Sequence, residues 1–135
     1  VEYYQLKLGQ DLNNNFYKFN SNYFTNLIFK DVDTSNVTNM SDMFNYCRKL
    51  TSLNLSGCDT SNVTYMNRMF YYCIFLNYLD LSGWDTSNVT EMSSMFYKCS
   101  DLKTIRMVGC SQTTIDKIKA QLSTDGITGC TVVTE

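Results

Sequence analysis

The hexapeptide DTSNVT occurs three times in the chain, at residues 33–38, 59–64 and 85–90. Successive copies begin at equal intervals, and identical side chains recur at the same interval outside the hexapeptide. Self-similarity with a period of roughly 20–50 residues is typical of repeat proteins, so we predict a stack of three copies of one structural unit. The recurring positions are Met40, Met66 and Met92; Met43, Met69 and Met95; Phe44, Phe70 and Phe96; Cys47, Cys73 and Cys99; Leu50, Leu76 and Leu102; and Gly57, Gly83 and Gly109.

Each repeat combines two hydrophobic periodicities. Leu53 and Leu55 alternate with polar residues in the segment LTSLNLSG at 50–57, which predicts a short strand with one buried face. In the segment SNVTNMSDMFNYC at 35–47, apolar residues recur at steps of three and four, which predicts a helix of about three turns. A strand and a helix of this size cannot bury their apolar faces alone, so we expect successive repeats to stack.

The two ends of the array are expected to form caps. The segment FTNLIFKD at 24–31 predicts a strand before the first repeat, and residues 1–8 alternate like a further strand. The C-terminal segment GCTVVTE at 129–135 predicts an edge strand with polar residues that protect it. Between the third repeat and this strand we predict a helix with an apolar face (Ile115, Ile118, Leu122), a capping box (Thr113, Asp116) and a terminating Gly126.

We therefore predict a single repeat domain over residues 1–135. Its N-terminal cap and first strand would occupy residues 1–31, and its C-terminal cap residues 110–135. The three repeats between them would span 32–57, 58–83 and 84–109.

Composition narrows the classes of function. The net charge is −2 and no Lys/Arg cluster is present, which argues against nucleic acid as a partner. No apolar run approaches the roughly 18 residues of a membrane span, so we expect no membrane insertion by this segment. The chain contains no His, so Ser–His and Cys–His nucleophile pairs are impossible. We predict a protein that is not an enzyme and has no catalytic residues, cofactor or metal site.

Two segments carry a family resemblance, LTSLNLSGCDT at 50–60 and LNYLDLSGWDT at 76–86. Both fit the leucine-rich-repeat pattern L-x-x-L-x-L-x-x-(N/C)-x-L, with Cys58 at the N/C position and Thr60 in place of the usual apolar residue. The longer stretch LDLSGWDTSNVTEMSSMFYKCSDL at 79–102 resembles the BspA-like leucine-rich-repeat proteins of bacterial surfaces, including the mycoplasma-type surface lipoproteins. The segments 1–20 and 111–135 lie outside the resemblance.

The resemblance implies an α/β fold, a leucine-rich-repeat solenoid of 26-residue strand–helix units. Its parallel sheet would lie on the concave side and its helices on the convex side, between irregular N- and C-terminal caps. The resemblance also implies export, and thus an extracellular or cell-surface location, with a role in adhesion or recognition. The start VEYYQLKLGQ has neither a Met nor a signal-like apolar stretch, so we expect the signal and the anchor to lie outside this chain.

The repeated hexapeptide itself is predicted to be a structural joint between strand and helix. Asp or Ser would cap the helix, and the Asn side chains would bond the backbone of neighbouring turns. Two alternatives stay open, N-glycosylation at the Asn-Val-Thr triplets and calcium bound by the column of Asp residues. The joint residues are Asp33, Asn36, Asp59, Asn62, Asp85 and Asn88.

The six cysteines are predicted to be mostly free and buried. Five of them recur with the period, and Trp84 fills one position of the second cysteine column. Bridges between adjacent members of the column Cys47, Cys73 and Cys99, or between Cys110 and Cys130, remain possible. Zinc is disfavoured because the chain has no C-x2-C pair and no His.

Positions that differ between repeats are the candidates for partner binding, because the stacking does not dictate them. On the predicted outward face of the strands these are Asn54, Tyr78, Asp80 and Arg106, and before the second strand they are Ile74 and Phe75. Ile74 and Phe75 would anchor a partner or a dimer contact, or would instead shield the start of the strand. A set of tyrosines (Tyr46, Tyr71, Tyr72, Tyr97) is expected to be half-buried on the helix side.

The leading hypothesis is a non-catalytic recognition or adhesion module that binds a protein or a glycan through its concave sheet. It would act as a monomer or a weak dimer. The alternative is a structural spacer or assembly module of a cell-surface or phage appendage.

Overall fold

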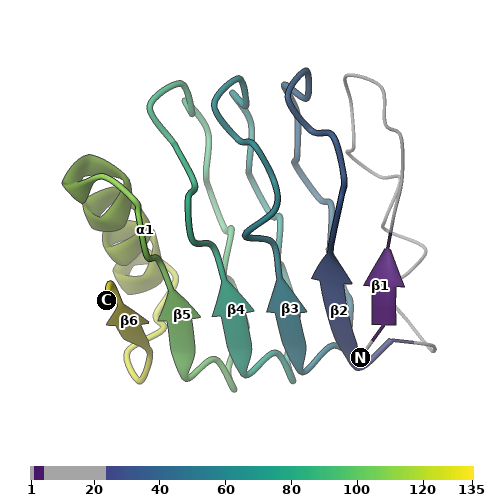
Figure 1. Ribbon diagram of the computed structural model, residues 1–135. Helices are drawn as coiled ribbons and strands as arrows, with labels where there is room; N and C mark the ends of the chain where they lie inside the picture. The colour runs from purple at the N-terminus through teal and green to yellow at the C-terminus, as the bar shows by residue number, and fades with distance from the viewer. Residues whose placement is uncertain (1, 5–23) are drawn as a thin grey trace.

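The computed structural model describes residues 2–4 and 24–135 and shows a mixed α/β fold (Figure 1). Six parallel strands form one sheet in chain order, and the helix α1 lies beside the β6 end of this sheet. The α/β class and the parallel sheet are thereby confirmed. The elements are β1 (Glu2–Tyr4), β2 (Asn26–Phe29), β3 (Ser52–Asn54), β4 (Tyr78–Asp80), β5 (Thr104–Arg106), α1 (Gln112–Thr124) and β6 (Thr131–Val133). Most of the predicted N-terminal cap, residues 5–23, lies outside the described residues.

Neighbouring strands from β2 to β5 pair with a constant offset, which equals the period of the sequence. Leu27 pairs with Leu53, Leu53 with Leu79 and Leu79 with Ile105, and all four side chains are buried. Because side chains alternate along a strand, the residues on either side of this apolar row point away from the core. The sequence repeat thus places equivalent residues side by side across the sheet.

The prediction of helices within the repeats, on the side opposite the sheet, is wrong. The segments 35–47, 61–73 and 87–99 consist of successive turns, and α1 is the one helix within residues 2–4 and 24–135. The apolar residues that suggested a helix are nevertheless buried, with Val37, Met40 and Phe44 fully inaccessible to solvent. The residues spaced three and four apart are therefore buried as predicted, but a series of turns buries them and not a helix.

The physical reason is that alternate backbone N–H groups of these turns bond to the next repeat, while the N–H groups between them bond to the carbonyl three residues earlier. The N–H of Met40 donates to the carbonyl of Tyr65, and the N–H of Phe44 to that of Met69, each over 2.8 Å. In an α-helix the same groups would donate to carbonyls four residues earlier. Left-handed backbone conformations at fixed positions also interrupt any helix, at Asp42, Tyr46, Arg68, Tyr72, Ser94 and Lys98.

Side chains stack in the core in the same order as the repeats. The Phe44 and Phe70 rings are 5.8 Å apart between centroids, as are those of Phe70 and Phe96, and both pairs are nearly parallel. Such aromatic pairs add about 0.5–1.5 kcal/mol each beyond the burial of their area. Trp84, the first residue of the third repeat, is also buried, and its indole N–H donates to the carbonyl of Leu55, near the end of the first repeat, at 3.1 Å.

The helix α1 begins earlier than the capping box at Thr113 and Asp116 predicts. Ser111 is the N-cap residue, and its hydroxyl accepts a hydrogen bond from the N–H of Thr114 at 3.2 Å. In the helix that follows this N-cap, Thr114 is buried together with the predicted apolar face of Ile115, Ile118 and Leu122. At the other end, Gly126 has a φ of +78° just after the C-cap residue, so it terminates the helix as predicted.

Side chains of the C-terminal segment bond to backbone groups of the third repeat. Lys117 Nζ donates to the carbonyls of Thr86 and Val89 at 2.8 and 3.1 Å. The carboxylate of Asp125 accepts from the N–H of Phe96 at 2.9 Å, whereas the equivalent N–H groups of Phe44 and Phe70 donate to backbone carbonyls. Asp125 thus supplies an acceptor for the Phe96 N–H, which would otherwise be unsatisfied at the end of the array.

Candidate functional site

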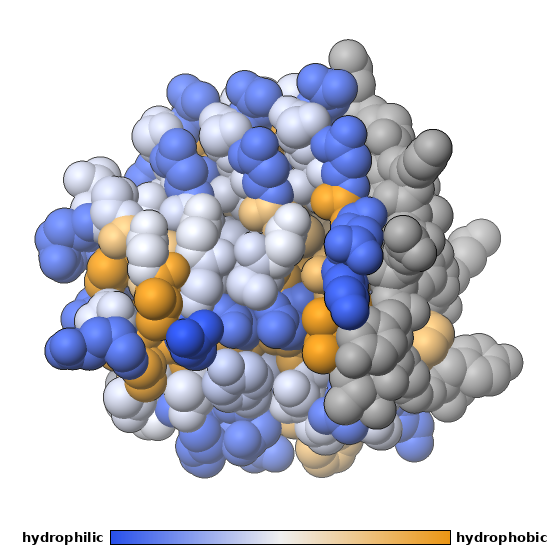
Figure 2. All heavy atoms as spheres, viewed as in Figure 1, coloured by the Kyte–Doolittle hydropathy of each residue, from blue (hydrophilic) through white to orange (hydrophobic). Residues whose placement is uncertain are grey.

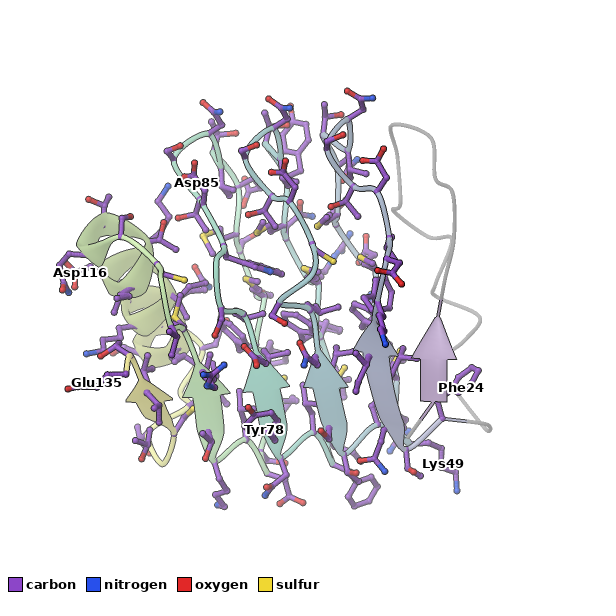
Figure 3. All side chains as sticks on the ribbon, in the orientation of Figure 1. Phe24, Lys49, Tyr78, Asp85, Asp116 and Glu135 are labelled. Carbon is purple, nitrogen blue, oxygen red and sulfur yellow. The ribbon has the colours of Figure 1, made fainter. Side chains whose placement is uncertain are left out.

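The candidate site is the face of the sheet that points away from the core. Figure 2 views the molecule from this side and shows mainly hydrophilic residues over β3 and β4, with hydrophobic residues gathered toward β5 and β6. Tyr78 lies on β4, near the middle of the sheet (Figure 3). Four of the six predicted partner-binding residues belong to this face: Asn54, Tyr78, Asp80 and Arg106.

Asn54, Asp80 and Arg106 form one row across three strands. Asn54 pairs with Asp80, and Asp80 pairs with Arg106, in the register of the sheet. Asp80 is 4% exposed although it lies on the outward face, and its carboxylate is 3.4 Å from Nη1 of Arg106. The Arg106 side chain is 44% exposed, so it spans from this ion pair to the solvent.

Asp80 is held in place from its own strand as well. Its Oδ1 accepts a hydrogen bond from the N–H of Ser82 at 2.9 Å, and Oδ2 faces Arg106. Both oxygens are therefore oriented by partners before any ligand arrives. Asn54 makes the equivalent contact, since its Oδ1 accepts from the N–H of Ser56 at 2.9 Å and from its hydroxyl at 2.6 Å.

Tyr78 occupies the next row, opposite Ser52 and Thr104. It is half-buried, and partial burial followed by the negative charge of Asp80 raises the pKa of its phenol above the usual value. The hydroxyl thus stays protonated at neutral pH and is available as a hydrogen-bond donor. An aromatic ring with a polar tip beside a solvent-reaching guanidinium is the combination that often anchors binding partners.

Ile74 and Phe75 lie elsewhere, before the start of β4. Phe75 is 51% exposed and lines a shallow hollow together with Arg48, Lys49 and Asp101. In Figure 3, Lys49 lies at the lower edge of the molecule, where the strands begin. Ile74 is half-buried. The six predicted residues therefore divide between the face of the sheet and this lower edge.

The DTSNVT segments lie at the opposite edge, where Figure 3 places Asp85. In each copy the Asp side chain accepts from the N–H of the Ser two residues later, as Asp59 does from Ser61 at 3.0 Å. These Asp residues therefore close turns, and the expectation that they cap helices is wrong because no helix follows in this described part of the chain. The amide of Asn62 donates to the carbonyl of Ser35 in the previous repeat at 2.7 Å.

The remaining joint residues occupy equivalent positions. Asn88 donates to the carbonyl of Ser61 at 2.7 Å, and a corresponding acceptor for Asn36 would fall among residues that are not described. Hydrogen bonds from Ser side chains and backbone lower the pKa of Asp33, Asp59 and Asp85. In residues 2–4 and 24–135, no cluster of three or more metal-ligating side chains is present.

A column of buried threonines is a feature that sequence reasoning missed. Thr34, Thr60 and Thr86 are at most 1% exposed, at the position where the leucine-rich-repeat pattern has an apolar residue. The hydroxyls of Thr34 and Thr60 donate to the carbonyls of Asp59 and Asp85, each at 2.9 Å. The departure from the pattern at Thr60 was the signal that could have revealed this column.

The tyrosines Tyr46, Tyr71, Tyr72 and Tyr97 form a ladder on the turns, with ring centroids 4.7–5.8 Å apart. Tyr97 is partly exposed and the other three are half-buried. This close mutual packing explains their burial without a partner.

All six cysteines are free thiols. Cys73 and Cys99 donate to the carbonyls of Phe44 and Phe70 at 3.0 Å, so the sulfur column also links neighbouring repeats. Burial raises the pKa of Cys58 to about 12 and that of Cys73 well above its usual value. Thiols with such pKa values are poor nucleophiles.

Within residues 2–4 and 24–135, no helix combines the length and the apolar character needed to cross a lipid bilayer. A family model described as "Mycoplasma protein of unknown function, DUF285" matches residues 10–119. No curated protein matches the chain.

Proposed function

The chain belongs to the DUF285 family, and we propose that it is a non-catalytic recognition module that binds a protein or a glycan through the outward face of its sheet. The family match covers most of the chain, including all three DTSNVT segments. We further propose that the module acts at a cell surface or outside the cell, as the likeness of its repeats to BspA-like proteins suggests.

The proposal includes a leucine-rich-repeat solenoid as the finer description of the fold. It is supported by the constant offset between paired strands and by the burial of leucines at the pattern positions Leu50, Leu53 and Leu55. The turns that replace the expected helices are compatible with such a repeat, because leucine-rich repeats vary in the segment that follows the strand.

The observation that carries the proposal is the Asp80–Arg106 pair beside Tyr78. The Asp80 side chain, which is 6% exposed, orients the guanidinium of Arg106, whose side chain is 44% exposed, on a face that the stacking of repeats leaves open. An oriented guanidinium binds carboxylates and sulfates with two parallel hydrogen bonds, and it loses little conformational entropy on binding. A partner with an acidic group that meets Arg106 and an apolar or sugar ring that meets Tyr78 fits this face.

A screen of the chain against arrays of glycans and cell-surface proteins tests the proposal, followed by binding assays on variants. We expect Tyr78→Ala and Arg106→Gln each to weaken binding by about tenfold or more, since each removes an anchor worth at least about 1.4 kcal/mol. The control variant Tyr65→Ala removes an exposed tyrosine from another part of the surface and should bind normally. Unchanged binding by both sheet variants, with unchanged melting temperatures, would refute the role of this face.

A second candidate function is that of a structural spacer or assembly module. The hydrogen bonds that join neighbouring repeats through Thr60, Asn62 and Cys73 favour it, because so much of the sequence serves stacking. It predicts that no partner in the screen depends on Tyr78 or Arg106.

A further inference from the structure

A hollow of about 580 Å³ lies at the C-terminal end of the array, between the third repeat and the loop 125–129 that follows α1. The buried Leu102 and the half-buried Ile127 contribute apolar surface to it, and Ser100 and Thr128 contribute hydroxyl groups. Its size falls within the roughly 300–1,000 Å³ of pockets that hold small molecules. The mixture of apolar surface and hydroxyl groups suits a polar organic molecule rather than a bare ion.

The side chains that line this hollow carry a net positive charge, whereas the whole chain carries a net negative charge. Two lysines, Lys98 and Lys103, and one carboxylate, Asp125, line it, whereas the chain carries a net charge of −2. Neither lysine forms an ion pair with a carboxylate in the described part of the chain. Asp125 Oδ2 is already occupied, since it accepts from the N–H of Phe96 at 2.9 Å and from Gln121 at 3.1 Å. The Lys98 ammonium lies 5.4 Å from the centroid of the Tyr97 ring. With two lysines and one carboxylate the lining is net positive, and it thus favours an anion.

A backbone donor completes the site. The N–H groups of Tyr46 and Tyr72 donate to the carbonyls of Tyr71 and Tyr97 in the following repeat, each at 2.8 Å. Lys98 is the third member of this column and has the same left-handed backbone conformation, with φ of 64°. Among residues 24–135, nothing accepts a hydrogen bond from its N–H. The N–H of Lys98 is thus the last donor of this column, and Lys98 is one of the residues that line the hollow.

From these three observations we infer that the hollow binds a monosaccharide-sized organic anion, of the class of carboxylated or phosphorylated sugars. The acidic group accepts from the N–H of Lys98, where a carbonyl of the next repeat would otherwise stand, and is neutralised by Lys98 and Lys103. Ser100 and Thr128 bond the hydroxyls of the ligand. This site is separate from the outward face of the sheet and does not depend on the proposed function of that face.

The test is a titration of the ¹⁵N-labelled chain with glucuronate and with glucose 6-phosphate, followed by NMR. We expect saturable shifts at the amide of Lys98 and at residues 126–129 with both acids. Neutral glucose should produce none, because it lacks the group that the two lysines and the N–H select. Inorganic phosphate should bind at least about tenfold more weakly than glucose 6-phosphate, because it leaves the hydroxyls and the apolar surface without contacts.

Variants keep the inference falsifiable. The double substitution Lys98→Gln and Lys103→Gln should lower the affinity for both acids at least about tenfold, since two charge-assisted contacts are lost. The matched control is Lys49→Gln with Lys119→Gln, which removes the same charge from exposed positions outside the hollow. Equal binding of glucose, equal binding of inorganic phosphate, or an unaffected double variant would each overturn the inference.

Discussion

Thr60 shows how one buried hydroxyl joins two repeats. Its Oγ1 donates to the carbonyl of Asp85 and accepts from the N–H of Asp85, both at 2.9 Å. The substitution Thr60→Val keeps the shape but leaves both backbone groups of the half-buried Asp85 without this partner. We expect it to lower the free energy of unfolding by about 1–3 kcal/mol, measured by urea denaturation.

Two comparisons isolate the hydroxyl. Thr60→Ser keeps both hydrogen bonds and loses only a methyl group, so it should cost less than Thr60→Val. Asn62→Ala removes the 2.7 Å bond to Ser35, but this contact is exposed and water can replace it, so we expect a cost of about 0.5–1.5 kcal/mol. If Thr60→Val were no more costly than Asn62→Ala, the buried bonds would not have the importance that we assign to them.

The Asp–Ser turns make stability depend on pH. Hydrogen bonds from the side chain and then the backbone of Ser61 lower the pKa of Asp59 in the folded state. A lowered pKa contributes stability that is fully present above the unfolded value of 3.8 and is lost as the pH falls through the folded value. We therefore expect Ser61→Ala to reduce the melting temperature at pH 7, by an amount that shrinks as the pH falls below about 4.

A control for this prediction is present in the chain. Ser56 makes the same two contacts with Asn54, over 2.9 and 2.6 Å, but the amide of Asn54 does not titrate. The loss of stability in Ser56→Ala should therefore be the same at pH 7 and at pH 3. A pH-dependent loss in both variants, or in neither, would contradict the explanation.

At the scale of elements, the turns within the repeats explain why sequence reasoning found the buried residues but not the backbone. Val37, Met40 and Phe44 are spaced as on a helix, and the pattern correctly identified them as core. The spacing does not state where each N–H group finds its acceptor. The acceptors of Met40 and Phe44 belong to the next repeat, which a local pattern does not contain.

The element that closes the array, α1, depends on Lys117. The ammonium group donates to the carbonyls of Thr86 and Val89 in the third repeat, and so joins the helix to the last turn of the array. We expect Lys117→Met to lower the free energy of unfolding by about 1.5–3 kcal/mol, the range for hydrogen bonds to charged groups. Chemical denaturation monitored by circular dichroism measures this change.

Lys119 offers the comparison, because it lies on the same helix but is exposed. Lys119→Met should change the stability by no more than about 0.5 kcal/mol, as is usual for surface substitutions. Similar losses in the two variants would mean that Lys117 contributes through the charge of the helix rather than through the two carbonyls.

At the scale of the whole molecule, the stability lost by a core substitution should depend on how many neighbouring repeats the substituted side chain contacts. Phe70 stacks on Phe44 and on Phe96, whereas Phe96 has a ring contact only with Phe70 in the described residues. Both side chains are fully buried. We expect Phe70→Ala to cost about 3–5 kcal/mol and to exceed Phe96→Ala by about 0.5–1.5 kcal/mol, one aromatic pair. Urea denaturation of the two variants tests the order, and the reverse order would contradict it.

The parallel sheet could be predicted because the period specifies its register. Once Leu53 and Leu79 are known to be equivalent, Asn54, Asp80 and Arg106 must form one row, and opposite charges in that row meet. The hollow at the end of the array could not be predicted in this way. Residues 125–129 have no counterpart in the repeats, so nothing in the period places them beside Lys98 and Lys103.

The constant offset between strands also bears on how such a protein can change in length. Strand partners are equivalent positions, and the hydrogen bonds between the first and second repeats recur between the second and third, so successive repeats make nearly the same contacts. Duplication or loss of one whole repeat in the interior would therefore join two surfaces that already fit. Recombination within the coding sequence can thus lengthen or shorten the molecule while Lys117, Asp125 and the terminal strand continue to close whichever repeat comes last.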